Sequence, residues 1–386
     1  MFDRPGSGDK AVLVSLDFGT PDHADSLDEL KLLSESAGVK VLGVFAGSRA
    51  KPDPSTFIGS GKLLEVGEAI EGLNANLVIF NHNISPIQQR NLERDLKVRV
   101  LDRTNLILDI FAQRARSHEG KLQVELAQLQ HLSTRLVRGW THLERQKGGI
   151  GMRGPGETQL ETDRRLIGTR IKFLQERLKK VRRQRITQQR GRRHGGLMNI
   201  SLVGYTNAGK STLFNRLTKS KTYVANQLFA TLDTTSRKLY LDPQHSAVIS
   251  DTVGFIRHLP HTLVAAFRAT LEETASADLL LHVVDAGNPQ RGQQIEEVNS
   301  VLAQVGAAQI PQILIYNKID THPEWQPGVE YDEYDRIIAV RVSALNGMGM
   351  DLIPKALLSW AEAKADFAGR ASGAESASEP AAYLAD

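Results

Sequence analysis

The sequence predicts an α/β protein in three parts. These are a small α/β domain, an antiparallel two-helix coiled-coil hairpin, and a doubly wound, mostly parallel α/β domain built on a phosphate-binding loop. Three observations predict this fold. Strand-like and helix-like segments alternate over residues 11–112, two helical leucine stripes flank a glycine-rich stretch at 148–158, and an apolar strand pattern at 199–204 runs into G-x-x-x-x-G-K-S.

The first part covers residues 1–112. The segments AVLVSL, KVLGVF, NLVIF and VRVLD predict short buried strands, and DSLDELKLLSES and SPIQQRNLERDL predict helices between them. The segment KPDPSTFIGSGK at 51–62 interrupts the pattern with Pro, Gly and Ser and predicts a loop. The alternation favours a small parallel sheet.

The second part, 113–196, predicts a hairpin of helices. Residues 113–147 read as one continuous helix with a stripe at Leu122, Leu126, Leu129, Leu132 and Leu136. A second stripe, spaced by four and three residues from Ile167 onward, has the periodicity of a coiled-coil seam and comprises Leu160, Ile167, Ile171, Leu174, Leu178 and Val181. The glycine-rich segment 148–158 between them cannot continue a helix and predicts the tip loop.

The second helix of this hairpin is strongly basic. Residues 164–193 hold 13 Lys or Arg and one acid, Glu176, while the whole 386-residue chain carries a formal charge of +4. Charged coiled-coil faces usually mix both signs, so we favour an RNA backbone as partner over a merely solvated face. No Trp- or Phe-rich face accompanies the charge, which makes a membrane the weaker rival. The candidate RNA contacts are Arg153, Arg182, Arg183, Arg185, Arg192 and Arg193.

The bulk composition limits the remaining possibilities. Hydrophobic residues make up 41% of the chain and charged residues 24%, as in soluble globular proteins. There is no cysteine, so neither disulfides nor thiolate metal sites exist. The segment MFDRPGSGDK lacks the basic start and apolar core of a signal peptide, and no apolar run reaches the roughly 20 residues that span a bilayer. We expect a cytoplasmic protein without membrane insertion.

The third part, 197–364, predicts a P-loop GTPase domain. NISLVG predicts a strand, and GYTNAGKST follows with Gly204, Gly209, Lys210 and Ser211 in the phosphate-loop spacing, ahead of a helix. Backbone amides of such a loop wrap phosphates, Lys210 reaches the β- and γ-phosphates, and the Ser211 hydroxyl ligates Mg²⁺. A chance glycine-rich turn would lack this strand and helix.

Three further motifs follow in the order that a GTPase requires, each after an apolar strand. DTVGF at 251–255 places Asp251 to hold Mg²⁺ through a water and the Gly254 amide to meet the γ-phosphate. NKID at 317–320 places Asp320, an acceptor, against the two donors on the guanine edge, so ATP would leave the carboxylate unpaired. In SALNG, 343–347, the Ala344 and Leu345 amides are candidates to donate to guanine O6.

The segment FATLDTTS at 229–236 predicts the switch that senses the γ-phosphate, with Thr231 as the second Mg²⁺ ligand. Lys210, Thr231 and Gly254 are the candidate catalytic positions, and no general base is expected. The candidate GTP contacts are Gly204, Tyr205, Thr206, Asn207, Ala208, Gly209, Lys210, Ser211, Thr212, Phe229, Ala230, Thr231, Leu232, Asp233, Asp251, Thr252, Val253, Gly254, Asn317, Lys318, Ile319, Asp320, Ser343, Ala344 and Leu345.

Two details bear on hydrolysis. Phe255 stands where Ras-like proteins place a water-orienting Gln, which predicts slow intrinsic hydrolysis and a partner that completes the site. Asn207 in the phosphate loop is a candidate to support K⁺, with a loop Asn that satisfies its own backbone as the alternative. The literal G-x-G-x-x-G at 149–154 follows a helix rather than a strand, so we reject a dinucleotide site there.

GPGETQLETDRR at 154–165, beside the four nucleotide motifs, resembles the HflX family of ribosome-associated GTPases. PDPSTFIGSGK and FATLDTTSR extend the resemblance over residues 1–360, and Phe255 suits the family. The resemblance implies binding to the large ribosomal subunit and its rRNA, ribosome-stimulated GTP hydrolysis, and splitting or rescue of stalled ribosomes in stress. It also links ATP to the N-terminal domain, although residues 1–112 hold no complete phosphate loop.

Two other functions stay open. One is a ribosome-assembly or RNA-binding GTPase, in which GTP is only a timer, and the other is an ATP-dependent RNA-remodelling enzyme. The seam of the hairpin can be satisfied within one chain, which favours a monomer. Residues 365–386, rich in Ala, Ser and Glu, predict a disordered tail.

Overall fold

The structure is a computed structural model that describes residues 8–19, 22–136, 159–194, 197–220, 228–242, 245–257 and 274–376. The chain folds as two compact units, each of which is assembled from three separate segments of the sequence. The N-terminal unit comprises Met1–Gly191 together with Ala225–Asp233 and Val253–Leu271, and the C-terminal unit comprises Arg192–Val224, Thr234–Thr252 and Glu272–Asp386.

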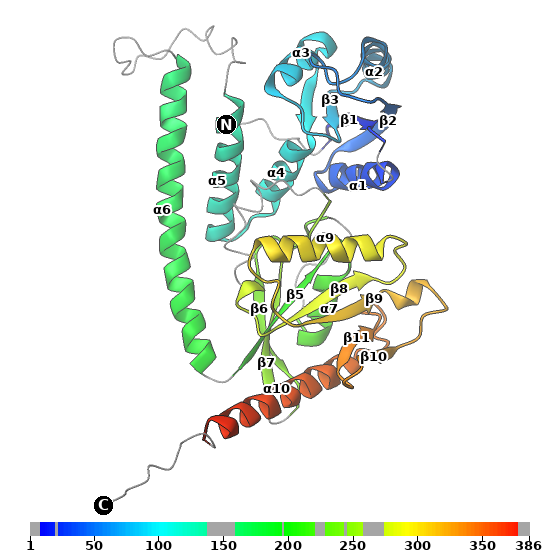
Figure 1. Ribbon diagram of the computed structural model, residues 1–386. Helices are drawn as coiled ribbons and strands as arrows, with labels where there is room; N and C mark the ends of the chain where they lie inside the picture. The colour runs from blue at the N-terminus through cyan, green and yellow to red at the C-terminus, as the bar shows by residue number, and fades with distance from the viewer. Residues whose placement is uncertain are drawn as a thin grey trace, which may run out of the picture. The chain divides into compact units, whose positions relative to one another are not determined.

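The N-terminal unit contains a four-stranded sheet in the order β2-β1-β3-β4, and every pairing is parallel. Its strands are β1 (Lys10–Asp17), β2 (Lys40–Ser48), β3 (Leu77–Phe80) and β4 (Arg99–Asp102). The helices are α1 (His23–Ser36), α2 (Ser60–Leu73), α3 (Pro86–Leu96) and α4 (Arg103–Arg114) (Figure 1). Apolar residues of α1 and α4 cover one face of the sheet and those of α2 and α3 the other, so the predicted small α/β domain is confirmed.

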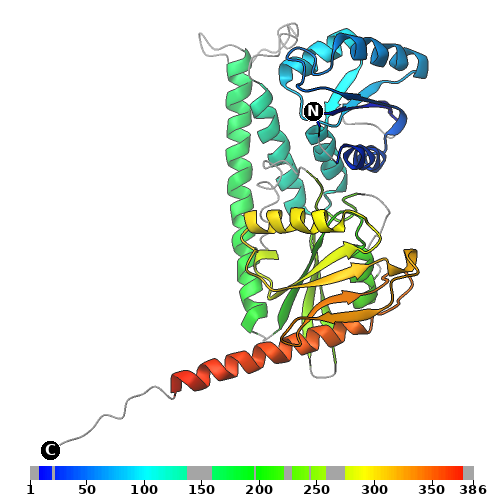
Figure 2. The same cartoon turned by 45° about the vertical axis from the view of Figure 1, so that its right-hand side comes forward.

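The helical hairpin consists of α5 (His118–Arg135) and α6 (Gln159–His194), which lie side by side (Figures 1 and 2). Leu122, Leu126 and Leu174 are buried between them, with Leu129, Ile171 and Leu178 packed around. The prediction of one continuous helix from residue 113 is wrong. Helix α4 ends at Arg114, and a new helix starts after Ser117, whose hydroxyl accepts from the Gly120 amide at 2.8 Å.

The C-terminal unit contains a seven-stranded sheet in the order β10-β11-β9-β8-β5-β7-β6. The five strands from β11 to β7 are parallel, and only the edge strands β6 and β10 are antiparallel to their neighbours. The strands are β5 (Met198–Gly204), β6 (Thr235–Tyr240), β7 (Ser246–Asp251), β8 (Leu279–Asp285), β9 (Gln312–Asn317), β10 (Gly328–Tyr331) and β11 (Ile337–Arg341).

Helices lie on both faces of this sheet. Helices α7 (Lys210–Thr218) and α10 (Leu352–Ser376) pack into one apolar core with the strands, while α9 (Arg291–Gln304) lies on the opposite face (Figure 1). This is the predicted doubly wound, mostly parallel fold. Such sheets bind ligands beyond the carboxyl ends of their parallel strands.

Two segments that were expected to lack regular structure, one as a loop and one as a disordered tail, contain helix. Helix α2 begins at Ser60, inside the segment 51–62 that was expected to be a loop. Helix α10 continues through residues 365–376, which the composition predicted to be disordered, and 377–386 lie outside the described residues. Ala-rich sequence is a good helix former, which accounts for the second difference. Within the described ranges, no helix has the length and apolar character that a bilayer span needs.

Candidate nucleotide site

The phosphate loop joins β5 to α7, and two of its residues must be glycine. Gly204 has a φ of +142°, and a Cβ there would lie 2.2 Å from the Val283 carbonyl oxygen. Gly209 has a φ of +93°, and a Cβ there would lie 2.2 Å from Nδ2 of Asn317. The loop therefore passes too close to β8 and β9 for any side chain, which leaves its backbone free to approach a ligand.

Lys210 opens α7 and is buried beneath the loop. Its Nζ donates to the backbone oxygens of Gly204 at 3.0 Å and Tyr205 at 2.8 Å. Burial lowers the pKa of Lys210 to about 8, and the Asp251 carboxylate opposes that shift. A buried ammonium whose charge is costly gains from an anionic ligand, which fits a phosphate site.

Ser211 and Asp251 are brought together although 40 positions separate them. The Ser211 hydroxyl donates to Oδ2 of Asp251 at 2.7 Å, and Asp251 is fully buried at the end of β7. Thr252 fixes the chain beyond β7, because its hydroxyl donates to the Leu202 carbonyl at 2.6 Å. A hydroxyl and a carboxylate beside a phosphate loop are oxygen donors of the kind that Mg²⁺ takes, so the residues fit this ion.

Asn317, at the end of β9, links the phosphate loop to the segment 343–347. Its Nδ2 donates to the Ala208 carbonyl and its Oδ1 accepts from the Ala344 amide, both at 2.9 Å. The sequence assigned that Ala344 amide to guanine O6. In the structure this amide donates to Asn317 instead, and the bond connects the phosphate loop with the segment 343–347.

Asp320 and Lys318 follow Asn317 and point to different partners. Asp320 is exposed, and the Ser343 hydroxyl donates to its carboxylate. Lys318 adopts a left-handed φ of 64°, and its Nζ pairs with Oδ2 of Asp285 at 2.8 Å. A carboxylate oriented by one hydroxyl and otherwise open to solvent can accept from two donors on a planar base.

Two residues of this site were missed by sequence reasoning. Arg216, on α7, donates to the carbonyls of Ala344 at 3.2 Å and Leu345 at 2.7 Å and so supports the 343–347 segment. Asp285, the partner of Lys318, ends the buried strand β8. A carboxylate at the carboxyl end of an apolar strand was a readable signal for Asp285, whereas no local pattern marks Arg216.

Residues 229–233 of the predicted switch segment 229–236 belong to the N-terminal unit, and residues 234–236 belong to the C-terminal unit. Leu228, Phe229 and Leu232 are buried in the core that α1 and α4 line. The Phe229 ring stands edge-on to Phe111, with centroids 4.6 Å apart, and the Leu228 amide donates to the Ser36 hydroxyl at 2.9 Å. These side chains hold the segment that carries Thr231. Thr231, the predicted second Mg²⁺ ligand, therefore belongs to the N-terminal unit, whereas Ser211 and Asp251 belong to the C-terminal unit.

The segment after Thr252 is built into the N-terminal unit in the same way. Val253 and Ile256 join the same core, and Phe255 is 2% exposed. Arg257 pairs with Asp22 at 3.4 Å. The sequence predicted that 229–236 and 251–255 respond to nucleotide, but not that the N-terminal unit would hold most of both.

The candidate RNA contacts lie on or near α6. Arg182 and Arg183 are exposed, and the single acid Glu176 pairs with Lys179 at 2.7 Å. Arg185, Arg192 and Arg193 fall within the helix, and Arg153 lies outside the described residues.

The phosphate loop, the paired hydroxyl and carboxylate, and the exposed Asp320 at the carboxyl edge of a doubly wound sheet define a P-loop GTPase. Three protein-family profiles match the chain. They are described as GTP-binding GTPase N-terminal over residues 24–112, GTP-binding GTPase Middle Region over 114–193, and 50S ribosome-binding GTPase over 199–318.

The chain is 55% identical to the GTPase HflX of Escherichia coli (strain K12), an alignment that covers 92% of this chain and 84% of that protein. It is 46% identical to the GTPase HflX of Caldanaerobacter subterraneus subsp. tengcongensis, over 90% and 80% of the two chains. The chain belongs to the HflX family of GTPases, and it is a GTP-binding, GTP-hydrolysing enzyme.

The crystal structure of SsGBP in complex with GDP has a similar fold, with a TM-score of 0.52 and 24% identity over 92% of this chain and 98% of that one. This similarity supports the assignment of the fold.

Proposed function

We propose that this GTPase binds the large ribosomal subunit in the cytoplasm and hydrolyses GTP in a ribosome-stimulated cycle that splits or rescues stalled ribosomes under stress. The observation that carries the proposal is the excess of 13 cations over one acid along residues 164–193. The family profile described as 50S ribosome-binding GTPase supports the same partner. A helix of this charge gains affinity for an RNA backbone by releasing counterions.

The packing of the hairpin leaves several of those cations exposed to solvent. Leu174, with Ile171 and Leu178, packs in the seam against α5, whereas Leu166 and Phe173 of the same helix are exposed. Arg182 and Arg183 are exposed, and the acid Glu176 pairs with Lys179 at 2.7 Å. We propose domain boundaries at 1–112, 113–196 and 197–364, which the matched ranges of the three family profiles support.

At the nucleotide site we propose that the phosphate loop and Lys210 bind the phosphates and that Asp320 binds the guanine edge. Ser211 and Thr231 would ligate Mg²⁺, with Asp251 acting through a water. Bound Mg²⁺ supplies positive charge at the β- and γ-phosphates. Asn207, whose φ of 60° is left-handed, is the proposed support for K⁺.

Hydrolysis itself is proposed to depend on the ribosome. The Phe255 side chain is buried and apolar, so it cannot orient an attacking water. Phosphoryl transfer needs positioning and electrostatic stabilisation, and an ordered partner can supply what Phe255 does not.

Sedimentation with purified large subunits tests the proposed partner. The protein, loaded with a non-hydrolysable GTP analogue, is compared with Arg182→Glu/Arg183→Glu and with a control, Lys31→Glu/Lys355→Glu, that reverses two exposed cations on α1 and α10. We expect the α6 variant to bind at least about tenfold more weakly and with a shallower salt dependence, and the control to bind normally. Equal binding by all three proteins would refute the α6 interface.

An assay of binding to intact ribosomes and of their splitting distinguishes ribosome rescue from ribosome assembly. Binding only to immature large subunits, with no splitting, would favour an assembly GTPase. RNA unwinding that requires ATP and survives Asp320→Asn would favour the ATP-dependent remodelling enzyme.

A further inference from the structure

The beginning of helix α5 is held by a residue of the switch segment. The Asp233 carboxylate accepts from the backbone amides of Arg116 at 2.9 Å and Ser117 at 2.7 Å, and from the Ser117 hydroxyl. The same hydroxyl accepts from the Gly120 amide and caps the helix. Asp233 therefore extends the N-cap of α5, where a negative charge also meets the positive end of the helix dipole.

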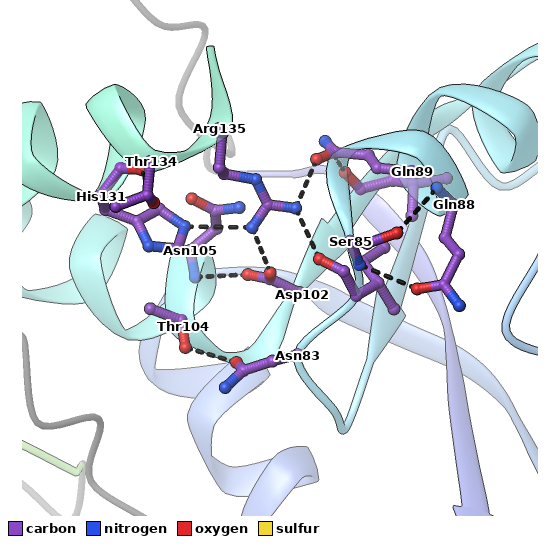
Figure 3. Close-up of polar contacts among 12 residues, drawn as sticks. Asn83, Ser85, Gln88, Gln89, Asp102, Thr104, Asn105, His131, Thr134 and Arg135 are labelled. Atoms are coloured by element: carbon purple, nitrogen blue, oxygen red, sulfur yellow. Dashed lines mark hydrogen bonds and ion pairs between the residues drawn. The ribbon is translucent and has the colours of Figure 1, made fainter. Parts of the chain in front are cut away.

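The other end of α5 is fixed to the N-terminal sheet (Figure 3). The Arg135 guanidinium pairs with Asp102 at 2.5 Å and donates to the Ile84 carbonyl at 3.0 Å and to Oε1 of Gln89 at 2.8 Å. Asp102 is buried and also caps α4 by accepting from the Asn105 amide at 2.8 Å. An 18-residue helix, about 27 Å long, thus has one end on the sheet and the other on the switch segment.

Contacts on both sides of Thr231 hold the switch segment to the N-terminal unit. Asp233 follows Thr231 by two residues, so their Cα atoms are at most about 7 Å apart. Phe229 and Leu232, on either side of Thr231, are anchored in the apolar core. Any displacement of Thr231 toward a ligand therefore strains either this core or the bonds from Asp233 to α5.

We propose that Asp233 is a positioning residue that couples the γ-phosphate to the helical hairpin. When Thr231 responds to GTP and Mg²⁺, the hydrogen bonds between Asp233 and the first turn of α5 change, and α5 passes the change to α6 along their leucine seam. This inference rests on the proposed role of Thr231 at the nucleotide site, but it holds for any partner of the hairpin. Coupling of this kind is reciprocal, so a partner that moves α5 also changes the affinity for GTP.

Gly120 offers a sharp way to break the contact. A Cβ at Gly120 would lie 2.2 Å from Oδ1 of Asp233, so Gly120→Ala displaces the carboxylate, while alanine favours the helix itself. The matched control is Gly72→Ala in α2, where a Cβ meets nothing within 4 Å. Ser117→Ala provides a second disruption by removing the hydroxyl that donates to Asp233.

The test is amide hydrogen exchange of residues 116–122, measured once with GDP bound and once with a non-hydrolysable GTP analogue bound. Mg²⁺ is present and ribosomes are absent in each measurement. The amides of Arg116 and Ser117 are donors to Asp233 and report the contact directly. In the wild type and Gly72→Ala, we expect the analogue to change exchange by at least about fivefold relative to GDP. In Gly120→Ala and Ser117→Ala, we expect less than about twofold, with the analogue still bound.

Two results would overturn the coupling. One is exchange in the wild type that does not depend on the γ-phosphate, and the other is a dependence that Gly120→Ala and Ser117→Ala both retain. Since ribosomes are absent, a failure of the proposed ribosomal role leaves this test unaffected.

Discussion

Replacing the Asp320 carboxylate by an amide should change which base the enzyme accepts. Guanine presents two donors to this position, and a hydrogen bond to a charged acceptor contributes about 1.5–3 kcal/mol. In Asp320→Asn, one side-chain oxygen still accepts from guanine. The other is replaced by an NH2 group, which faces the second guanine donor and cannot accept from it. The expected loss is about 3 kcal/mol, or roughly 150-fold in affinity for GDP and GTP.

Xanthine carries an oxygen where guanine carries its amino group, so the amide of Asp320→Asn can donate to it. The change in base preference is measured as the binding of fluorescent GDP and XDP to the wild type and to Asp320→Asn. Asp351→Asn is the control, because that carboxylate is an exposed surface group paired with Lys355. We expect GDP to bind about 150-fold more weakly and XDP more tightly only in Asp320→Asn. Unchanged GDP affinity in that variant would refute the assignment of Asp320 to the base.

Three further predictions follow from individual contacts. In Gly204→Ala the new Cβ would clash with a β8 carbonyl, so urea titrations should show a free energy of unfolding lower by more than about 1 kcal/mol. The control Gly292→Ala places its Cβ in open space on α9 and should not lower it. Burial lowers the pKa of His282 to about 4, so the unfolded chain binds more protons below about pH 6.5. Stability should then fall by up to about 3 kcal/mol between pH 6.5 and 4, and urea titrations of His282→Gln should show a smaller fall; an equal fall would contradict the assignment. Arg135→Ala leaves the buried Asp102 carboxylate unpaired and should cost roughly 3 kcal/mol of unfolding free energy, and a cost below about 1 kcal/mol would show that the clamp on α5 is dispensable.

The parts of the site that the sequence predicted are those fixed by local backbone chemistry. Gly204 and Gly209 are required by the path of one loop, and Asp320 follows its strand by three residues, so a short pattern is enough to mark them as candidates. The alternation of strands and helices likewise predicted both parallel sheets, because buried strands and amphipathic helices leave their own periodicity in the chain.

The parts that sequence reasoning missed depend on contacts between distant segments. Asp233 meets Ser117 across 116 positions, and nothing in FATLDTTS distinguishes a capping carboxylate from a solvated one. Arg216 meets Leu345 across 129 positions. The break between α4 and α5 was missed because it falls in a short polar stretch, QRARSHE at 113–119, that contains neither Pro nor Gly. Ser117, a common N-cap residue, was the overlooked signal.

GTP turnover with and without purified large ribosomal subunits, in K⁺ buffer, tests the central claim most directly. Because Phe255 cannot orient water, we expect slow turnover by the protein alone and strong stimulation by large subunits. Fast turnover by the protein alone that ribosomes do not change would refute ribosome-dependent hydrolysis, and it would point to a catalytic group within the chain.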